Sequence, residues 1–338
     1  MKDPVELHNE AIIIDNTCPL AVLEDYHRNY MQGGVTAIAA TVGYGVPGIG
    51  SLDFTMKNLG KWQARFRSHD TPLLHVTRAK DILKAKKEGK LGIIFHFQGT
   101  APFEDDVHTV DLYHKLGLRM CQLCYNEKDL VGCGCAVEKD TGLTQFGQNI
   151  IGEMNRLGIV VDCGHTGYNT TMDAIAASSS PVVISHGNAR AVCNNRRNYE
   201  DDLIRAVAQN GGVVGFNGFP GFVANKPKPA MDDLLDHVDH LAGIAGPENV
   251  CVGIDYFEYQ AGVADNETAG QIYDFLLESG AWAREEYPPP PWYYPEGIEM
   301  PEKMENLTIG LHRRGYSEKE IKGILGLNML RVFKAIWE

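Results

Sequence analysis

Short apolar runs recur along the chain, and more polar segments with helical spacing separate them. Each run has four to eight residues, is rich in β-branched side chains and is bounded by Gly, Pro or Asn, which is typical of buried strands. The eight runs are 11–15, 35–42, 91–97, 120–125, 159–163, 181–185, 212–217 and 249–255. Eight strands alternating with helices predict an α/β fold, a parallel sheet closed into a (β/α)8 TIM barrel. An open doubly wound sheet is the alternative.

Between the runs, apolar residues recur three and four positions apart, which is the spacing of one helix face. Helices are predicted on this basis at 104–116, 144–157, 169–177, 201–208 and 231–245. The stretch 43–69 is a long polar insertion, and we expect it to cover the C-terminal face of the barrel or to flank it.

The pattern changes after the eighth run. Segment 286–297 (EYPPPPWYYPEG) is rich in Pro and aromatic residues and too stiff for a helix, so it is either a surface loop or a lid or subunit contact. Within 302–338 we predict a helix over 302–314, a cap at Ser317 with Glu320 three residues on, and a last helix near 328–337. The whole chain, 1–338, is expected to form one barrel domain.

Composition narrows the function classes. With 44% hydrophobic and 22% charged residues, the chain should bury a large core. A net charge of −13 argues against nucleic acid or an anionic membrane as partner. No apolar run approaches the roughly 20 residues of a membrane span. The polar N-terminal segment and eight scattered cysteines lead us to expect reduced thiols in a cytoplasmic protein.

Two histidines follow neighbouring predicted strands at matching points. His165 ends the motif DCGH after the fifth strand, and His186 ends SH after the sixth. The carboxyl ends of parallel strands meet at one edge of a barrel, so these imidazoles could be part of a metal site; hydrogen-bonded core histidines are the alternative. With Asp255 they could hold one Zn²⁺ and leave a position open. Asp255 could instead serve as general base or cap a helix.

Four segments carry a family resemblance. The segments GLTxFGxxIIxEMNRLGIVVDCGH, PVVISHGNAR, Arg197-Asn198 and the closing GYSEKEIKGILGLNMLRVF resemble the membrane (renal) dipeptidase family of the amidohydrolase superfamily. The resemblance implies a metal-dependent hydrolase barrel with two zinc ions that cleaves dipeptides. It also implies that His165 and His186 bind the second ion, that Asp255 lies near the first, and that Arg197 and Asn198 meet the substrate carboxylate.

The chain departs from that family at the remaining ligand positions. Thr17-Cys18-Pro19 stands where the family has His-x-Asp, and Gln98 stands where it has a bridging glutamate. We therefore expect zero or one zinc ion, with Gln98 as a weak ligand. His96 lies two residues before Gln98, so both can face one side of the strand, which makes His96 the spare ligand. Tyr125, about where some family members have a substrate-binding histidine, and Asn126 are expected to orient substrate.

The sequence thus favours a dipeptidase-like amidohydrolase with an altered metal site, acting on a small amide or a dipeptide-like substrate. One alternative is a metal-free barrel that binds a small molecule without hydrolysis. Another is a metal-independent enzyme that uses Cys18 or Cys124 as nucleophile. A homodimer is a candidate assembly.

Overall fold

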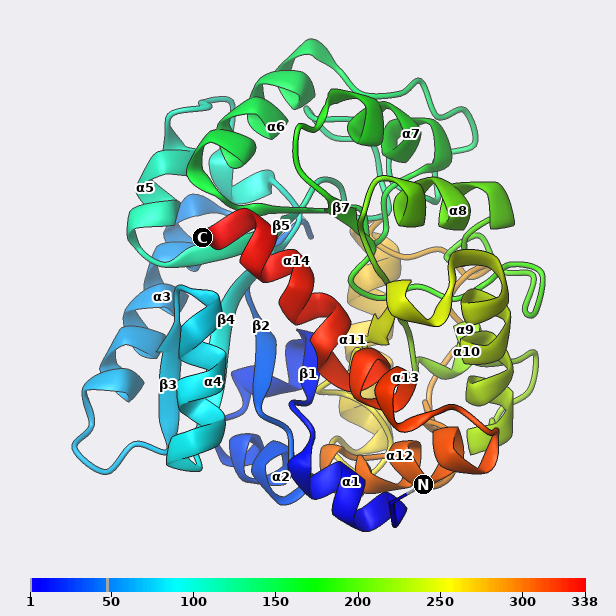
Figure 1. The fold of residues 1–338 in the computed structure, drawn as a ribbon. Coiled ribbons are helices and arrows are strands. Elements are labelled where there is room, and N and C mark those ends of the chain that lie inside the picture. The colour runs from blue at the N-terminus through cyan, green and yellow to red at the C-terminus, as the bar shows by residue number, and fades with distance from the viewer. Residues whose placement is uncertain (1, 47–48) are drawn as a thin grey trace.

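The computed structural model describes residues 2–46 and 49–338, in which helices and strands alternate along most of the chain (Figure 1). The nine strands within these residues are β1 (Ile14–Cys18), β2 (Ala37–Tyr44), β3 (Leu73–Val76), β4 (Leu91–Gln98), β5 (Leu118–Gln122), β6 (Val160–Asp162), β7 (Val182–Val183), β8 (Val214–Phe216) and β9 (Val250–Val252). The fourteen α-helices of the same residues are α1 (Pro4–Glu10), α2 (His27–Gln32), α3 (Leu52–Arg67), α4 (Ala79–Glu88), α5 (Thr109–Lys115), α6 (Gln145–Leu157), α7 (Tyr168–Ala177), α8 (Asp201–Gln209), α9 (Pro220–Val223), α10 (Met231–Ala245), α11 (Asn266–Glu278), α12 (Glu305–Arg313), α13 (Glu318–Lys322) and α14 (Asn328–Trp337).

The strands form a closed parallel ring. β1, β2, β4, β5, β6 and β7 pair in that order, and β8 pairs with β9. A bridge between Ile184 and Val214 joins β7 to β8. The ring closes where the Asn16 side chain donates to the Val252 carbonyl at 2.6 Å and the Ile254 amide donates to Asp15 Oδ1 at 2.9 Å. The predicted (β/α)8 barrel is confirmed, and each of the eight predicted runs overlaps one of its strands.

Three features differ from the sequence-based prediction. β3 was not predicted; it pairs with the first half of β4, from Leu73 opposite Leu91, outside the order of the ring. The helix predicted at 104–116 begins only at Thr109, because a turn with Glu104 at φ 54° precedes it. The insertion 43–69 contains α3, whose face with Leu59 and Trp62 is buried, and its residues 47 and 48 lie outside the described part of the chain.

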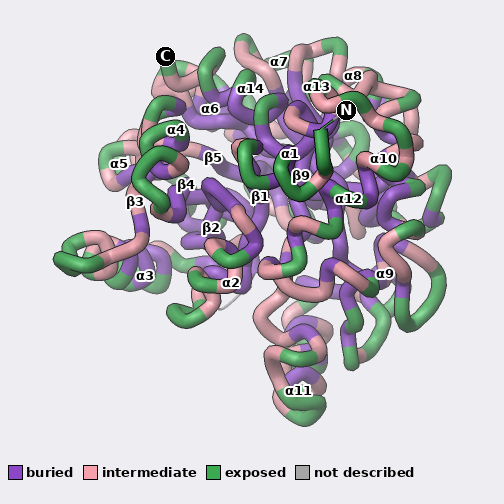
Figure 2. Tube along the Cα trace, turned by 60° about the horizontal axis from the view of Figure 1, so that its bottom comes forward, coloured by how far each residue is buried: buried purple, intermediate pink, exposed green. Residues whose placement is uncertain are grey.

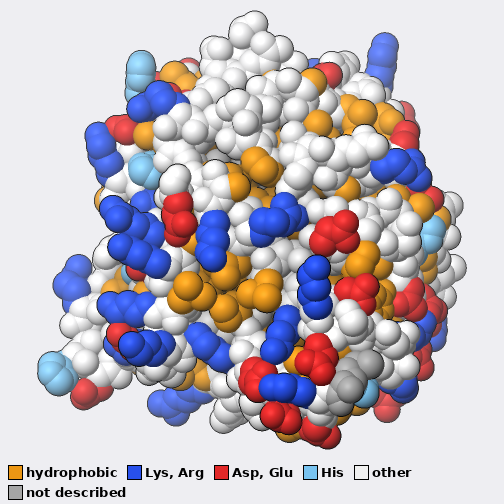
Figure 3. Space-filling model, viewed as in Figure 1, with side chains coloured by type: hydrophobic (Ala, Val, Ile, Leu, Met, Phe, Trp, Pro, Cys, Tyr) orange, Lys and Arg blue, Asp and Glu red, His pale blue; other side chains and the backbone are white. Residues whose placement is uncertain are grey.

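Helix α14 covers the N-terminal end of the barrel and crosses the centre of the view in Figure 1. Its buried side chains Met329, Val332 and Phe333 pack with strand residues such as Ile14. Arg331 donates to the Gly211 carbonyl at 2.8 Å, just before β8. Figure 3 shows basic and acidic side chains interspersed around an apolar patch on this side. The open end of the barrel is therefore the opposite one, where the strands have their carboxyl ends.

Aromatic residues between β9 and α12 cover that opposite end. Trp282 stacks on Tyr287 with ring centroids 4.0 Å apart, and Trp292 and Tyr294 are buried. Three aromatic residues of the Pro-rich segment 286–297, Tyr287, Trp292 and Tyr294, thus pack inward, whereas its residues Pro288, Pro289, Pro291 and Tyr293 are exposed. Helix α11, in the same region, stands out from the body of the molecule in Figure 2. Within the described residues, no helix is both long and apolar enough to cross a bilayer.

Asp15, which helps to close the barrel, should make stability depend on pH. Its side chain is fully buried, and burial raises its pKa to about 7. The folded state therefore keeps a proton that the unfolded state releases near pH 4, so stability falls as the pH rises from about 4 through about 7. When the pH is raised from about 5 to about 8, the unmodified protein should lose about 2–3 kcal/mol of unfolding free energy through this group, and Asp15→Asn should not show that loss.

Urea unfolding of both proteins at the two pH values measures this loss. Asp274→Asn, at an exposed position of α11, is the control. Its free energy of unfolding should differ from that of the unmodified protein by the same amount at both pH values. A difference between Asp15→Asn and the unmodified protein that does not change with pH would contradict the burial argument.

Candidate functional site

A cavity of about 180 Å³ lies at the carboxyl ends of the strands. Residues at or just after the carboxyl ends of β1, β2, β4, β5, β6, β8 and β9 all contribute to its wall, together with α11 and the aromatic cover. The lining residues are Pro19, Tyr44, Val46, Ile49, Gln98, Tyr125, His165, Phe219, Phe222, Asp255, Phe257, Glu258, Tyr259, Ile272, Phe275, Leu276, Trp282 and Tyr287. Catalytic and binding groups of barrel enzymes lie at this end.

Asn126 fixes the orientation of His165. The Asn126 amide nitrogen donates to the Ala281 carbonyl at 2.7 Å, so its Oδ1 faces His165 Nδ1, 2.7 Å away, as an acceptor. Nδ1 must then carry the ring proton, and Nε2 keeps its lone pair. His165 Nε2 is buried and has no hydrogen-bond partner among the described residues. The backbone of His165 has a φ of 60°, a left-handed conformation that is uncommon for a residue other than glycine, three residues after the end of β6.

His186 is held in the same tautomer by two hydroxyl groups. Its Nδ1 lies 2.6 Å from Ser185 Oγ and 2.9 Å from Thr17 Oγ1. Each hydroxyl uses its single proton elsewhere, Ser185 on Asp162 Oδ2 at 2.6 Å and Thr17 on the Asn16 carbonyl at 2.6 Å. Both oxygens can therefore only accept from Nδ1, which leaves the Nε2 lone pair of His186 free; in the part of the chain that the structure describes, this atom too has no partner.

Both imidazoles are neutral. Burial lowers the pKa of each ring well below its ordinary value, and the Arg197 charge adds to the effect. The ring centroids are 4.9 Å apart. Two neutral rings with free Nε2 lone pairs in one buried place are suited to bind a cation such as Zn²⁺, whose usual ligand is neutral imidazole oriented by a hydrogen bond at its other nitrogen.

Asp255 lies next to this pair. Its Oδ2 is 4.0 Å from His186 Nε2 and accepts from the Asn217 amide at 3.3 Å. Like His165, it has a positive φ, 61°, at the end of its strand. Burial raises the pKa of Asp255 to about 8, so the carboxyl group binds a proton readily near neutral pH.

The other two candidate ligands differ in position. Gln98 lines the cavity and donates from its amide nitrogen to Thr41 Oγ1 at 2.9 Å, so its carbonyl oxygen is the atom it could offer. His96 is fully buried and is not among the lining residues. Its Nε2 lies 3.0 Å from Asp162 Oδ2. His96 thus contacts the carboxylate that orients Ser185, rather than the cavity.

These residues fit one ion better than two. Across residues 2–46 and 49–338, no three His, Cys, Asp or Glu side chains are grouped closely enough to hold a metal as they stand. The two free Nε2 atoms supply half of a tetrahedral set, with Asp255 as neighbour. At the first strand, the Thr17 hydroxyl contacts His186 Nδ1, and the Pro19 side chain has no atom that can bind a metal. The first strand therefore provides no ligands for a second zinc ion.

The expected substrate-binding residues fall into two groups. Tyr125 lines the cavity and stacks on His165 with centroids 4.2 Å apart, whereas Asn126 supports His165 from behind. Arg197 is buried against Phe222, 5.4 Å from the ring, and donates to the His186 carbonyl at 3.2 Å. Its Nε and Nη1 have no partners among the residues described. The Asn198 amide donates to the Cys193 and Phe222 carbonyls at 2.8 and 2.9 Å and so holds a loop.

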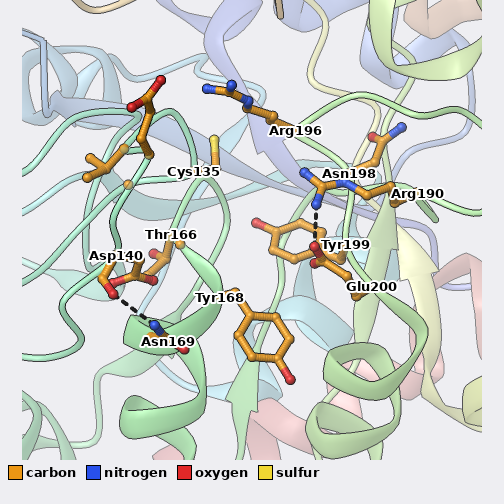
Figure 4. Close-up of a pocket in the computed structure, with 14 residues that line it drawn as sticks. Cys135, Asp140, Thr166, Tyr168, Asn169, Arg190, Arg196, Asn198, Tyr199 and Glu200 are labelled. Atoms are coloured by element: carbon orange, nitrogen blue, oxygen red, sulfur yellow. Dashed lines mark hydrogen bonds and ion pairs between the residues drawn. The ribbon is translucent and has the colours of Figure 1, made fainter.

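A larger cavity of about 610 Å³ is lined by Thr166 and Tyr168, which follow His165 along the chain, and by residues of the segment 190–200 (Figure 4). Arg190 pairs there with Glu200, and Asn169 donates to the Asp140 carbonyl at 2.8 Å. Cys135 and Asn198 also line it. Its polar groups are largely engaged with one another. His165 lines the smaller cavity and not this one, and His186, which lines neither, lies next to His165 and Asp255, so we place the candidate site in the smaller cavity.

Several site residues were not predicted from the sequence. Ser185 orients His186, and Trp282, Phe257 and Glu258 line the cavity. Ser185 stands directly before His186, and Glu258 follows Asp255 by three positions, so proximity along the chain was an available signal for both. Trp282 offers no such signal, because only the fold brings it to the cavity.

Three comparisons with known proteins agree with this architecture. The family model described as "Membrane dipeptidase (Peptidase family M19)" matches residues 11–286 and 292–338. An uncharacterized dipeptidase of Schizosaccharomyces pombe is 28% identical over 275 residues, which are 79% of this chain and 58% of that protein. Dipeptidase 3 of Rattus norvegicus is 26% identical over 271 residues, 78% of this chain and 49% of that protein.

The chain therefore spans between 49% and 58% of the length of these two relatives. A solved structure of an amidohydrolase from Pseudomonas aeruginosa is 30% identical, with a TM-score of 0.90 over 99% of both chains.

Proposed function

Because the chain belongs to the membrane dipeptidase family, peptidase family M19, we propose that it hydrolyses a small amide or a dipeptide-like substrate in the smaller cavity. The observation that supports this most is the pair of buried imidazoles, His165 and His186, each with a free Nε2 next to Asp255. We propose that they hold at most one zinc ion. When bound, this ion would supply the positive charge that polarises an amide carbonyl.

Asp255 is the proposed general base and acid. With a pKa raised to about 8 by burial, it can take a proton from the attacking water and return it to the leaving amine. Tyr125 would position the substrate against His165, on which it stacks. Gln98 would offer its carbonyl oxygen as a weak ligand. The aromatic cover surrounds the cavity with apolar side chains, and a less polar surrounding strengthens each of these polar contacts.

Arg197 is the proposed partner of a substrate carboxylate, because its Nε and Nη1 are unpaired within the described residues. Arg197 itself does not line the cavity, but Phe222, on which it packs, does. A carboxylate would therefore have to reach past Phe222. Asn198 would act indirectly, since it holds the loop that carries Phe222. The eight free thiols are compatible with a reducing compartment, and we propose a cytoplasmic location.

The alternatives are distinguishable. A metal-free binding barrel would use the same cavity without hydrolysis, and zinc content of the purified protein separates it from the hydrolase. A cysteine nucleophile is disfavoured, because burial raises the pKa of Cys18 and of Cys124 well above the ordinary value. A thiol of raised pKa is a poor nucleophile. Loss of activity on alkylation would favour it nonetheless.

Zinc content and turnover of a dipeptide panel test the proposed single-ion site. The unmodified protein should hold no more than one zinc per chain and cleave ordinary dipeptides slowly. Losing one metal's charge stabilisation removes several kcal/mol, and each 1.36 kcal/mol is about a factor of ten in rate. The triple variant Thr17→His, Pro19→Asp and Gln98→Glu should bind a second ion and turn over dipeptides faster.

Zinc analysis and initial rates, measured on both proteins, decide the outcome. Two tightly held ions in the unmodified protein, or rates on the order of 10–1000 per second, would show that the altered site is fully competent. Absence of hydrolysis across small amides and dipeptides, with zinc supplied, would favour the binding protein instead.

A further inference from the structure

Glu258 is a second acidic residue of the cavity, and the proposed chemistry assigns it no role. It lies three residues after Asp255 and lines the cavity wall. Its Oε2 is shielded from solvent and has no hydrogen-bond donor among residues 2–46 and 49–338. Burial raises its pKa to about 7. A shielded carboxylate oxygen without a donor lowers stability, and a ligand that brings a donor would relieve the cost.

The surroundings of Glu258 suit a cation. Tyr44 and Tyr259 line the same cavity as Glu258. Burial, and then the charge of Glu258, raises the pKa of both tyrosines. Phe257 packs edge-on against Tyr259 at 5.3 Å between centroids. Aromatic faces attract cations. The cavity has two carboxylates on its wall, Asp255 and Glu258, and none of its described lining residues is Lys or Arg.

The wall also offers apolar surface to a side chain. Val46, Ile49 and Ile272 line the cavity together with Tyr44 and Tyr259. A linear chain of methylene groups could pack on this surface while its charged end meets Glu258, as lysine side chains do elsewhere. An anionic or a short polar side chain would find no comparable partner there.

We propose that the cavity selects substrates with a cationic side chain on an apolar stem, of the lysine type, and that Glu258 is its counter-ion. This inference rests on the proposed function, because it takes the amide to lie at His165, His186 and Asp255. Glu258 would then determine specificity rather than take part in bond cleavage. Because Glu258 would bind the cationic side chain, Asp255 would remain available as general acid and base.

Calorimetric binding to the full chain, with zinc supplied, tests the proposal. The probes are alanine–lysine dipeptides in both orders and analogues in which 2-aminoheptanoic acid, of equal length but uncharged, replaces lysine. In the unmodified protein one lysine peptide should bind about 10- to 100-fold more tightly than its neutral analogue, as expected for a hydrogen bond to a charged group. Glu258→Gln should abolish that preference, and Glu278→Gln, at an exposed position of α11, should keep it.

Equal affinity of charged and neutral peptides for the unmodified protein, including no binding of either, would overturn the inference. So would a preference that survives Glu258→Gln but disappears in Asp255→Asn, since Asp255 would then be the counter-ion. Because binding is measured rather than turnover, the two failures are distinguishable: selective binding of a lysine peptide without hydrolysis would contradict the proposed function while still supporting Glu258 as the counter-ion of a bound cationic side chain.

Discussion

Replacement of His186 by alanine should remove zinc binding and lower amide turnover by about three powers of ten or more. The ring supplies one of two free Nε2 atoms at the site. Its loss should cost several kcal/mol of charge stabilisation in the transition state, and about 4 kcal/mol corresponds to a thousandfold change in rate. The same reasoning applies to His165→Ala.

Zinc stoichiometry and initial rates on the best amide of a screen measure this effect. The control is His69→Ala, since the His69 side chain is 99% exposed and does not line the cavity. Circular dichroism verifies that each variant is folded. A His186→Ala protein that keeps its zinc and its rate would show that His186 is a hydrogen-bonded core residue, as one interpretation of the sequence allowed.

Loss of the Asp162 carboxylate should destabilise the fold by about 3–5 kcal/mol. The carboxylate accepts hydrogen bonds from the amides of Gly164 and Ser185, each at 2.9 Å, and from Ser185 Oγ at 2.6 Å. His96 Nε2 adds a contact at 3.0 Å. Asp162→Ala leaves these buried donors without an acceptor, which costs more than the hydrogen bonds contribute net.

Urea unfolding gives the change in free energy, with the exposed Asp53→Ala as control. Zinc affinity gives a second measurement. Ser185 would lose the acceptor that directs its proton away from His186, so affinity should fall about 10- to 100-fold. A change in unfolding free energy below about 1 kcal/mol would mean that water replaces the carboxylate and that the site is less tightly buried than the structure indicates.

The barrel was predictable because its strands are buried on both faces. The run Leu91–Phe97 is apolar except for His96 and is bounded by Gly and polar residues, a pattern that local sequence alone can reveal. β3 was missed because its middle residues are only partly buried and its run is short. α3 was missed because its buried face includes Thr55 and Asn58, which hide the apolar stripe.

The proximity of the two histidines was predictable for a different reason: residues that follow neighbouring strands of a barrel lie close together at its carboxyl end. What the sequence could not reveal is which groups hold the rings. Thr17 and His186 are 169 positions apart, and Asn126 and His165 are 39 apart. Such contacts arise only when the ring of strands closes. The contact of His96 with Asp162 has the same origin, since it joins two strands separated by β5.

The position of α14 has a consequence for how the chain folds during synthesis. This helix contacts α4, β9 and the turns before β6 and β8, so its partners are spread over most of the chain. A nascent chain that has not yet released α14 from the ribosome exposes the apolar lower rim of the barrel, including Ile14 and Val183. We expect barrel closure to wait until α14 emerges, and the apolar rim to favour aggregation of the unfinished chain in the interval.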